Sequence, residues 1–269
     1  MRVTISGGVH GNELLGVYMV KDLMRTEPSF SLQIEYLLAN PKAIEACRRY
    51  VDYDLNRSFS SFALNEDSAL YEFERAKTIK KRLENSDFLI DLHTTTANMG
   101  ITIVLSKEDE KSVAVAKILA QEFDDVKILR WFGTNEGDFI NSCVSSSITI
   151  ESGPVCQGVL DAELYFKTKK VLFRALDILQ KNEHTKESVA CYDVVGYKDF
   201  PRKNDELFGM IHPEFLGKDY KKLHKGDPIF ITFDEEEIFS DTEGYAVFIN
   251  EAAYYEKRIA FCLTKKVKI

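Results

Sequence analysis

The sequence lacks long apolar runs, paired cysteines and any excess of positive charge. No apolar run approaches the ~18 residues that a membrane-spanning helix needs. The five cysteines are an odd, widely spaced set without a Cys-x-x-Cys pair, which argues against a disulfide framework or a zinc ribbon. The chain has 35 basic and 43 acidic residues, a net charge of −8, which disfavours nucleic acid or an anionic membrane as the main partner.

A targeting signal is also missing from the start of this sequence. Met1 leads directly into the apolar run "RVTIS", with no basic segment followed by a long apolar one. Together with the unpaired cysteines, this predicts a cytoplasmic protein.

Strand-like and helix-like segments alternate over the first part of the 269-residue chain. This alternation predicts an α/β fold with a mostly parallel sheet flanked by helices on both faces. Beyond a polar stretch the sequence becomes rich in turn residues and short β-like runs. We therefore expect a domain over 1–187 and a smaller β-rich domain over 188–269. The expected strands are 2–6, 32–39, 88–92, 101–106, 126–131 and 146–151, and the expected helices are 13–24, 69–83, 111–123, 161–181 and one beginning at Pro41.

His10 and Glu13 form an H-x-x-E pattern in a glycine-rich loop directly after the first expected strand. Ligands gather at the carboxyl ends of strands in open α/β sheets, and His nitrogen and Glu oxygen both bind zinc well. The alternative is a helix that begins with Glu in its first turn beside a bystander histidine. The local pattern alone favours that alternative.

His93 strengthens the metal interpretation, because it ends another apolar strand, "FLIDLH". Asp91 lies two residues earlier, so both side chains point to the same face of the strand. A carboxylate in that place could orient a metal-bound imidazole. A histidine that simply finds a hydrogen bond at a strand end is the competing interpretation. His, Glu and His with one open position for water is a catalytic zinc set.

A catalytic zinc site also needs a proton acceptor, and Glu151 is placed to be one. It ends the expected strand "SSITIE", at the same edge of the sheet as the metal candidates. Such a carboxylate can take a proton from water and return it to a leaving amine. Taken alone, it is better explained as an ordinary turn carboxylate.

Two further segments carry candidate substrate-binding groups. "RRYVDYDLNRSF" holds Arg48, Arg49, Asn56 and Arg57, and arginine binds carboxylates bidentately and stabilises a developing oxyanion. Any one of these arginines can equally be a surface ion-pair partner. "NEAAYYEKR" at residues 250–258 offers tyrosine hydroxyls that could close over a substrate, or it can be a packed helix start.

Six ordered segments together resemble the aspartoacylase family, in the succinylglutamate desuccinylase/aspartoacylase branch of carboxypeptidase-like zinc hydrolases. They extend over residues 7–261, nearly the whole chain. The segments are "GGVHGNELLGVYMVK", "ANPKAIEACRRYVDYDLNRSF", "FLIDLHTTTANMG", "IESGPVCQGVL", "IHPEFLGKDYKKLHKGDPIFITFD" and "VFINEAAYYEKRIAF".

The resemblance implies a zinc-carboxypeptidase-like catalytic domain and a C-terminal domain that narrows the active-site entrance. It also implies an amidohydrolase that cleaves small N-acyl amino acids, with N-acetyl-L-aspartate the first candidate. One Zn²⁺ per chain is implied, with His10, Glu13 and His93 as its ligands. Glu151 matches the general base and acid of the family.

The substrate-binding residues follow from the same resemblance. Arg49 matches the arginine that polarises the scissile carbonyl, and Asn56 and Arg57 match residues that bind a substrate carboxylate. Tyr254 matches a tyrosine that the C-terminal domain contributes. A homodimer is a further implication.

One position departs from the family pattern. Aspartoacylase has a second substrate-binding arginine ten residues before the catalytic glutamate, where this chain has Asn141, and a tyrosine where this chain has Gly137. Arg130 is the nearest basic residue. Without that arginine, selection for a second substrate carboxylate should weaken.

Rival functions therefore stay open at this point. Within hydrolases, the chain could be a desuccinylase or a deacylase for neutral or aromatic N-acyl amino acids. Outside hydrolases, the glycine loop could form an anion- or nucleotide-binding site at a helix N-terminus. Against that, the loop has neither the G-x-G-x-x-G spacing nor the Lys-Ser/Thr ending of a P-loop.

Overall fold

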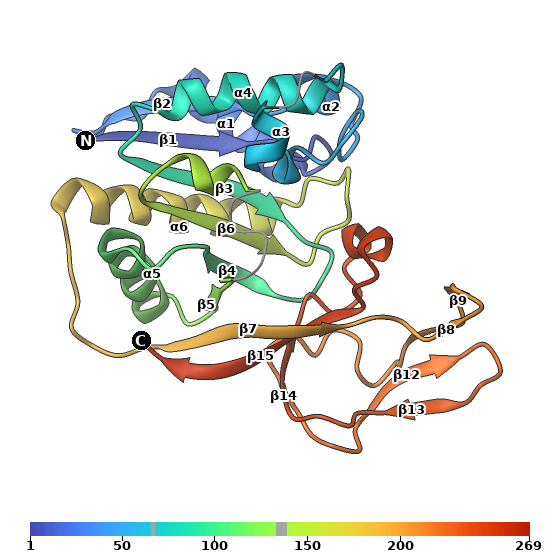
Figure 1. Cartoon of the computed structure of the whole chain (residues 1–269). Helices are drawn as coiled ribbons and strands as arrows, with labels where there is room; N and C mark the ends of the chain where they lie inside the picture. The colour runs from blue at the N-terminus through green and yellow to red at the C-terminus, as the bar shows by residue number, and fades with distance from the viewer. Residues whose placement is uncertain (66–67, 133–138) are drawn as a thin grey trace.

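The computed structural model describes residues 1–65, 68–132 and 139–269 (Figure 1). Over these ranges the chain forms a mixed α/β fold around one large sheet, followed by a β-rich C-terminal part. The fold class expected from the sequence is therefore confirmed. None of the described helices is both long and apolar enough to cross a bilayer.

The main sheet has the strand order β11-β14-β15-β7-β5-β4-β6-β3-β1-β2 among the described residues. The block β2-β1-β3-β6 is parallel, and so is the block β4-β5-β7. The two blocks meet where β4 lies antiparallel to β6, a reversal that the alternation of strands and helices does not predict. The strands of the first part are β1 Arg2–Gly7, β2 Gln33–Leu38, β3 Phe88–Thr94, β4 Gly100–Leu105, β5 Val126–Arg130 and β6 Ser147–Gly153.

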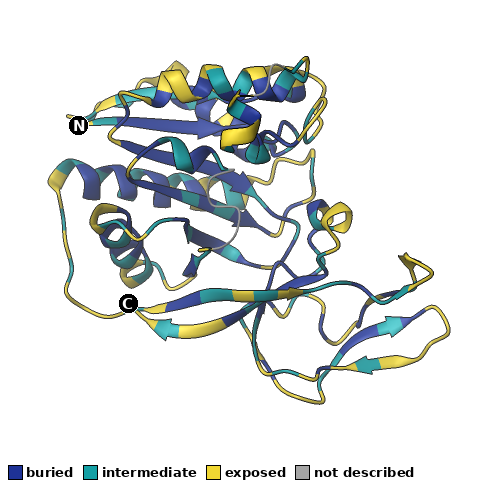
Figure 2. Cartoon of the chain, in the orientation of Figure 1, coloured by how far each residue is buried: buried dark blue, intermediate teal, exposed yellow. Residues whose placement is uncertain are grey.

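Helices cover both faces of this sheet (Figure 2). The larger core joins α1, α5 and α6 to one face of β1, β3, β4 and β6, and a second core joins α4 and the short helix η1 to the other face. This double cover explains why β3 is almost entirely buried. The helices are α1 Leu14–Thr26, α2 Pro41–Glu45, α3 Ser61–Asn65, α4 Tyr71–Leu83, α5 Glu110–Glu122 and α6 Ala162–Lys181, with short 3-10 helices η1 Leu55–Arg57, η3 Ile140–Cys143 and η4 Ala252–Lys257.

Side-chain caps fix several helix starts that the sequence predicts. The Asn40 side chain accepts a hydrogen bond from the Ala43 backbone N–H, with Pro41 at the first helical position. Asp161 caps α6 in the same way, by accepting from the Leu164 N–H. The helix that begins at Pro41 is short, because α2 ends at Glu45.

The C-terminal part continues the main sheet, which the sequence alone did not indicate. β7 pairs in parallel with β5, and β15 then pairs antiparallel with β7. The division near residue 187 stays a prediction, since the sheet runs across it. The C-terminal strands are β7 Ala190–Lys198, β8 Arg202–Lys203, β9 Glu206–Leu207, β10 Gly209–Ile211, β11 Lys222–Leu223, β12 Pro228–Thr232, β13 Glu237–Phe239, β14 Gly244–Val247 and β15 Phe261–Lys268.

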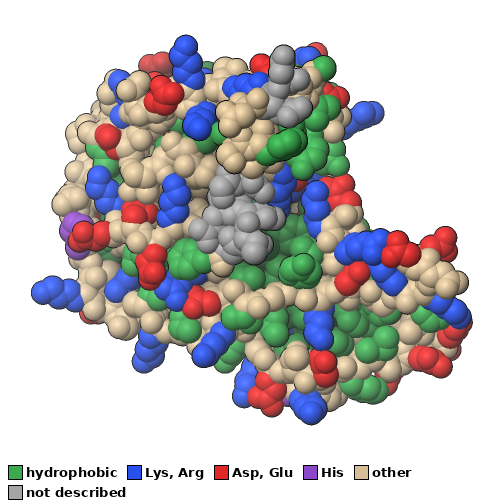
Figure 3. Space-filling view, in the orientation of Figure 1, with side chains coloured by type: hydrophobic (Ala, Val, Ile, Leu, Met, Phe, Trp, Pro, Cys, Tyr) green, Lys and Arg blue, Asp and Glu red, His purple; other side chains and the backbone are tan. Residues whose placement is uncertain are grey.

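The two parts of the chain differ in their surfaces. Figure 3 shows hydrophobic side chains gathered at the lower right, where Figure 1 places β12 and β13, and charges of both signs spread over the rest of this face. Several large hydrophobic residues of the C-terminal part are more than half exposed: Val195, Tyr197, Leu216, Phe233 and Phe239.

Candidate active site

A pocket opens where the parallel strands of the first part end, on the sheet face that carries α4. It encloses about 720 Å³ of empty space, the solvent at its mouth included, which suits a small molecule. Both parts of the chain line it. The lining includes His10, Glu13, Arg49, Asn56, Arg57, His93, Ser106, Trp131, Phe139, Asn141, Thr149, Glu151, Phe248, Glu251 and Tyr254.

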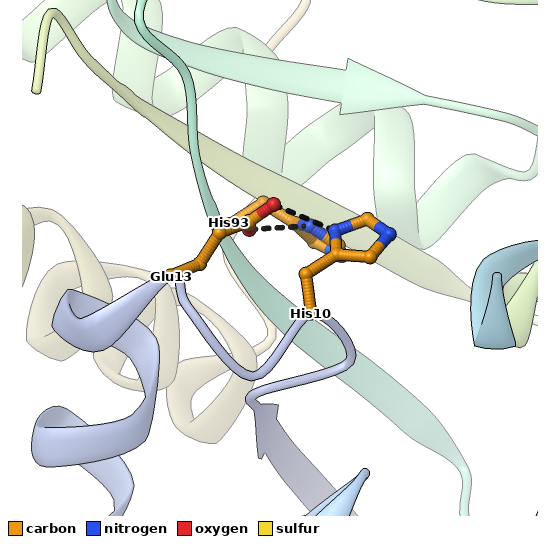
Figure 4. A group of neighbouring side chains, drawn as sticks. All are labelled: His10, Glu13 and His93. Carbon is orange, nitrogen blue, oxygen red and sulfur yellow. Dashed lines mark hydrogen bonds and ion pairs between the residues drawn. The ribbon is translucent and has the colours of Figure 1, made fainter. Parts of the chain in front are cut away.

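Three side chains in this pocket form a buried group that could hold a metal ion: His10, Glu13 and His93 (Figure 4). Their candidate ligand atoms all lie within 4.8 Å of one another. The Nδ1 atom of His10 is 2.6 Å from one oxygen of Glu13, and the Nδ1 atom of His93 is 2.9 Å from the other. Both imidazoles therefore turn their Nδ1 atoms toward the carboxylate, an arrangement in which one ion could contact all three side chains.

The second nitrogen of each imidazole is held by another buried carboxylate. Nε2 of His93 lies 2.8 Å from Asp91 and Nε2 of His10 lies 3.1 Å from Asp54. Asp91 in turn accepts a hydrogen bond from the Ser6 hydroxyl. Such carboxylate–histidine pairs fix the ring orientation and leave Nδ1 free for a metal.

Close backbone packing brings the loop after β1 to this position. A Cβ on Gly11 would lie 2.1 Å from the carbonyl carbon of Ala43, so only glycine lets the loop touch α2 so closely. Gly8 has φ +73°, a left-handed conformation that also favours glycine. The loop ends at Glu13, the residue before α1, whose side chain accepts a hydrogen bond from the Thr94 N–H at 3.0 Å.

The charges in this group compensate one another. Burial opposes ionisation of Glu13, yet His10 and His93 hold the pKa of its carboxyl well below the usual range. Burial likewise opposes the charged form of His93, but Asp91 and Glu13 raise its pKa well above the usual value. The carboxylates thus draw positive charge to the point where the three side chains meet.

Glu151 lies next to the metal candidates, as the strand ends predict. It pairs with His93 in the register of β6 and β3. Its carboxyl has no hydrogen-bond partner among the described residues. Burial raises its pKa to about 8, while His93 lowers it and Glu13 raises it further. This carboxyl therefore takes up a proton readily.

Arg49 reaches the same group from the segment after α2. Its Nη1 atom donates to Glu13 at 3.4 Å and its Nη2 atom donates to Asp54 at 3.3 Å. Both contacts are longer than the ~2.7–2.9 Å of strong charge-assisted hydrogen bonds. Its buried Nε has no partner among the described residues. The guanidinium therefore keeps donor capacity for another acceptor.

Asn56 and Arg57 line the pocket from η1. The side-chain oxygen of Asn56 accepts a hydrogen bond from the Ile140 N–H at 3.0 Å, which joins η1 to η3. The guanidinium of Arg57 lies 4.7 Å from the Phe139 ring and donates to the Asn56 carbonyl at 2.7 Å. No carboxylate of the described residues pairs with Arg57 within ion-pair distance.

Tyr254 enters the pocket from η4 in the C-terminal part. Its ring packs against Phe248 and Trp131, with centroids 5.3 and 6.5 Å apart. Burial raises the pKa of its hydroxyl well above the usual value. The structure thus gathers every residue that the resemblance assigned to metal, proton transfer or substrate.

The divergent segment is only partly described. Asn141 lines the pocket, whereas Gly137 lies outside the described residues. Arg130 is not part of the lining, because it makes a bidentate ion pair with Asp193 at 2.6 and 2.7 Å and contacts Glu108. It cannot replace the missing second arginine without breaking that pair.

Known proteins are similar to this chain in both sequence and fold. A model of the succinylglutamate desuccinylase/aspartoacylase catalytic domain matches residues 1–179, and a model of the AstE/AspA barrel-sandwich hybrid domain matches residues 187–266. The chain belongs to the succinylglutamate desuccinylase/aspartoacylase family. This confirms the resemblance drawn from the six segments.

Individual relatives of the family carry different names. A probable aspartoacylase of Trichodesmium erythraeum is 41% identical, with 100% of this chain and 98% of the relative covered. An N-acyl-aromatic-L-amino acid amidohydrolase of Xenopus tropicalis is 38% identical over 98% of this chain and 93% of the relative. The crystal structure of murine aminoacylase 3 superposes with a TM-score of 0.94 at 32% identity, over 100% of this chain and 96% of that one. These relatives support hydrolysis of N-acyl amino acids.

Two buried carboxylates of the site were not singled out in the sequence. Asp54 joins His10, Arg49 and the start of η1, where it accepts from the Asn56 N–H at 2.9 Å. Glu251 accepts hydrogen bonds from the hydroxyls of Thr95 and Thr96 and from the Thr96 N–H, so it ties η4 to the loop after β3. An Asp two residues before Asn56 was a usable signal for a turn cap, but Glu251 had no comparable signal.

Asp54 offers a test of how the site is held together. We expect Asp54→Asn to weaken zinc binding by roughly 10- to 100-fold, because the His10 ring loses the carboxylate that orients it. Competition with a chromogenic chelator measures this affinity. Asp52→Asn is the matched control, since the Asp52 carboxylate accepts a hydrogen bond from the Tyr71 backbone N–H at the surface. Unchanged zinc affinity in Asp54→Asn would limit Asp54 to capping η1.

Proposed function

We propose that this family member is a zinc-dependent amidohydrolase that removes the acyl group from small N-acyl amino acids. The observation that carries the proposal is the convergence of the two Nδ1 atoms of His10 and His93 on Glu13, with Glu151 beside them. The family and its deacylase relatives support the same reaction.

The residues present fit a zinc ion. Two imidazole nitrogens and one carboxylate, all buried, match the ligand types and number of catalytic zinc sites. His10, Glu13 and His93 would hold the ion, and Asp54 and Asp91 would orient the imidazoles. When bound, zinc supplies Lewis-acid polarisation and makes water more acidic.

The remaining chemistry falls to Glu151 and Arg49. The Glu151 carboxylate accepts a proton from the attacking water and passes it to the departing amine nitrogen. Arg49 donates hydrogen bonds from its guanidinium as negative charge develops on the scissile carbonyl oxygen. Its long contacts to Glu13 and Asp54 leave it free to do so.

Substrate binding is proposed for the residues that η1 and the C-terminal part contribute to the pocket. Arg57, which has no paired carboxylate among the described residues, binds the α-carboxylate of the substrate with Asn56 beside it. Tyr254 closes over the substrate from the C-terminal part.

The pocket favours a neutral or aromatic side chain on the substrate. Trp131, Phe139, Phe248 and Tyr254 give it aromatic walls. Among the described residues that line the pocket, the positively charged ones of the Lys and Arg types are Arg49 and Arg57. The sequence of residues 133–138 contains neither Lys nor Arg. N-Acetyl-L-aspartate, the first candidate from the sequence, would bury a second carboxylate without a second cation, which is costly. It and a succinyl donor remain the rival substrates.

Metal analysis and a substrate panel together test the function. We expect about one zinc per chain, and a higher kcat/KM for N-acetyl-phenylalanine than for N-acetyl-aspartate or N-succinyl-glutamate. His93→Ala should lose zinc and activity, whereas the control His224→Ala, which changes an exposed imidazole, should keep both. A zinc-free, inactive wild type after reconstitution would favour the rival anion-binding function instead. A cytoplasmic location and a homodimer remain proposals.

A further inference from the structure

The inner end of the pocket is built from neutral polar side chains. Thr149 precedes Glu151 by two residues on the same face of β6, which places it ~7 Å further from the metal candidates. Thr149 pairs with Val104 of β4, and Ser106 follows Val104 by two residues on that same face. Asn141 of η3 completes this end through a hydrogen bond of 3.4 Å from the Thr149 hydroxyl to its side-chain oxygen.

Two polar atoms at this inner end have no partner among the described residues. The Asn141 Nδ2 and the Ser106 Oγ are both buried and both unpaired. Their residues are only 4% and 8% exposed. A buried donor without a partner is unfavourable, so two of them lining one pocket indicate that a ligand completes their hydrogen bonds.

A phenol hydroxyl has the donor and the acceptor that these two atoms lack. Its oxygen can accept from the amide N–H of Asn141, and its proton can be donated to the Ser106 oxygen. The aromatic walls accommodate the ring that carries such a hydroxyl. A phenyl side chain would leave both atoms unpaired, and a carboxylate would enter without a cation to compensate it.

We propose that Asn141 and Ser106 form a specificity subsite that hydrogen-bonds an uncharged oxygen at the end of the substrate side chain, as in N-acyl-tyrosine. The proposal rests on the proposed deacylase function. It makes Asn141 and Ser106 specificity-determining residues, while Glu151 and Arg49 perform the reaction.

Matched substrates test the subsite directly. We expect the zinc-loaded wild type to prefer N-acetyl-tyrosine over N-acetyl-phenylalanine by roughly ten-fold in kcat/KM. Asn141→Leu and, separately, Ser106→Ala should bring this ratio close to one by lowering kcat/KM for N-acetyl-tyrosine more than for N-acetyl-phenylalanine. Ser106→Ala keeps the test valid if Asn141→Leu fails to fold.

A second serine provides the control. The Ser147 hydroxyl is also buried and unpaired among the described residues but does not line the pocket, so Ser147→Ala should leave the ratio unchanged. Calorimetric titration of the two substrates into Glu151→Gln should show the same ten-fold difference in affinity, without turnover.

The outcomes separate this proposal from the deacylase function. Hydrolysis of N-acetyl-phenylalanine with a wild-type ratio near one would overturn the subsite and leave the function intact. A preference for N-glycolyl-phenylalanine over N-acetyl-phenylalanine, with none for tyrosine, would assign the inner end to the acyl group and also overturn it. Failure to hydrolyse any member of the panel would overturn the function itself.

Discussion

Glu151→Gln should keep about one zinc per chain and lose roughly 10³-fold in kcat, in the middle of the range for general acid–base catalysis. Glutamine has nearly the same shape, so the pocket and the metal ligands should be preserved. It cannot accept a proton, so the substituted side chain can neither activate water nor protonate the leaving amine. Steady-state kinetics and metal analysis on one preparation measure both quantities.

The position of Glu151 makes this loss specific to proton transfer. The residue is paired with His93 across β6 and β3, yet its carboxyl makes no hydrogen bond with the described residues. Its removal therefore breaks no visible structural contact. Burial raises its pKa to about 8, which favours the protonated form that must deliver a proton to the leaving amine.

Glu251→Gln separates proton transfer from simple loss of pocket charge. Glu251 also lines the pocket, but its carboxylate is occupied by Thr95, Thr96 and the Ala253 N–H. We expect a much smaller loss of kcat from this variant than from Glu151→Gln. Near-wild-type kcat in zinc-loaded Glu151→Gln would contradict the assignment of the base.

The candidate site was predictable from sequence where it depends on strand ends. His10 and His93 each follow an apolar run, and parallel strands bring their carboxyl ends to one edge. Alternation within β3 places Asp91 and His93 on one face, with Ile90 and Leu92 in the core on the other. The two-residue alternation of a strand and the location at a strand end were enough to predict the place of these residues.

Other features depend on pairing that a single sequence does not encode. The run "ITIVLS" has the same alternation whether β4 is parallel or antiparallel to β6, so the reversal between the two blocks was not predictable. Glu251 meets Thr95 across 156 positions of chain, and nothing local marks that contact. β7 likewise continues the main sheet through a long-range pairing with β5.

Arg49→Leu should lower kcat by roughly 10²–10³-fold while zinc stays bound, the effect of removing one oxyanion-stabilising donor. KM should change less, because the guanidinium acts on charge that appears only as the carbonyl is attacked. The three metal candidates contact one another and do not require Arg49 to stay together. Kinetics with N-acetyl-phenylalanine, together with metal analysis, measure the separation of kcat from KM.

Arg48 supplies a control one residue away. Its side chain is exposed and outside the pocket lining, so Arg48→Leu should retain wild-type kcat. Added guanidinium ions should restore part of the kcat of Arg49→Ala and leave the wild type unaffected, because a free cation can occupy the vacated space. The kcat of Arg49→Lys should lie between those of Arg49→Ala and the wild type, since lysine keeps the charge but not the planar fork. A rise in KM with a matching fall in kcat/KM and an unchanged kcat would show that Arg49 only binds the substrate.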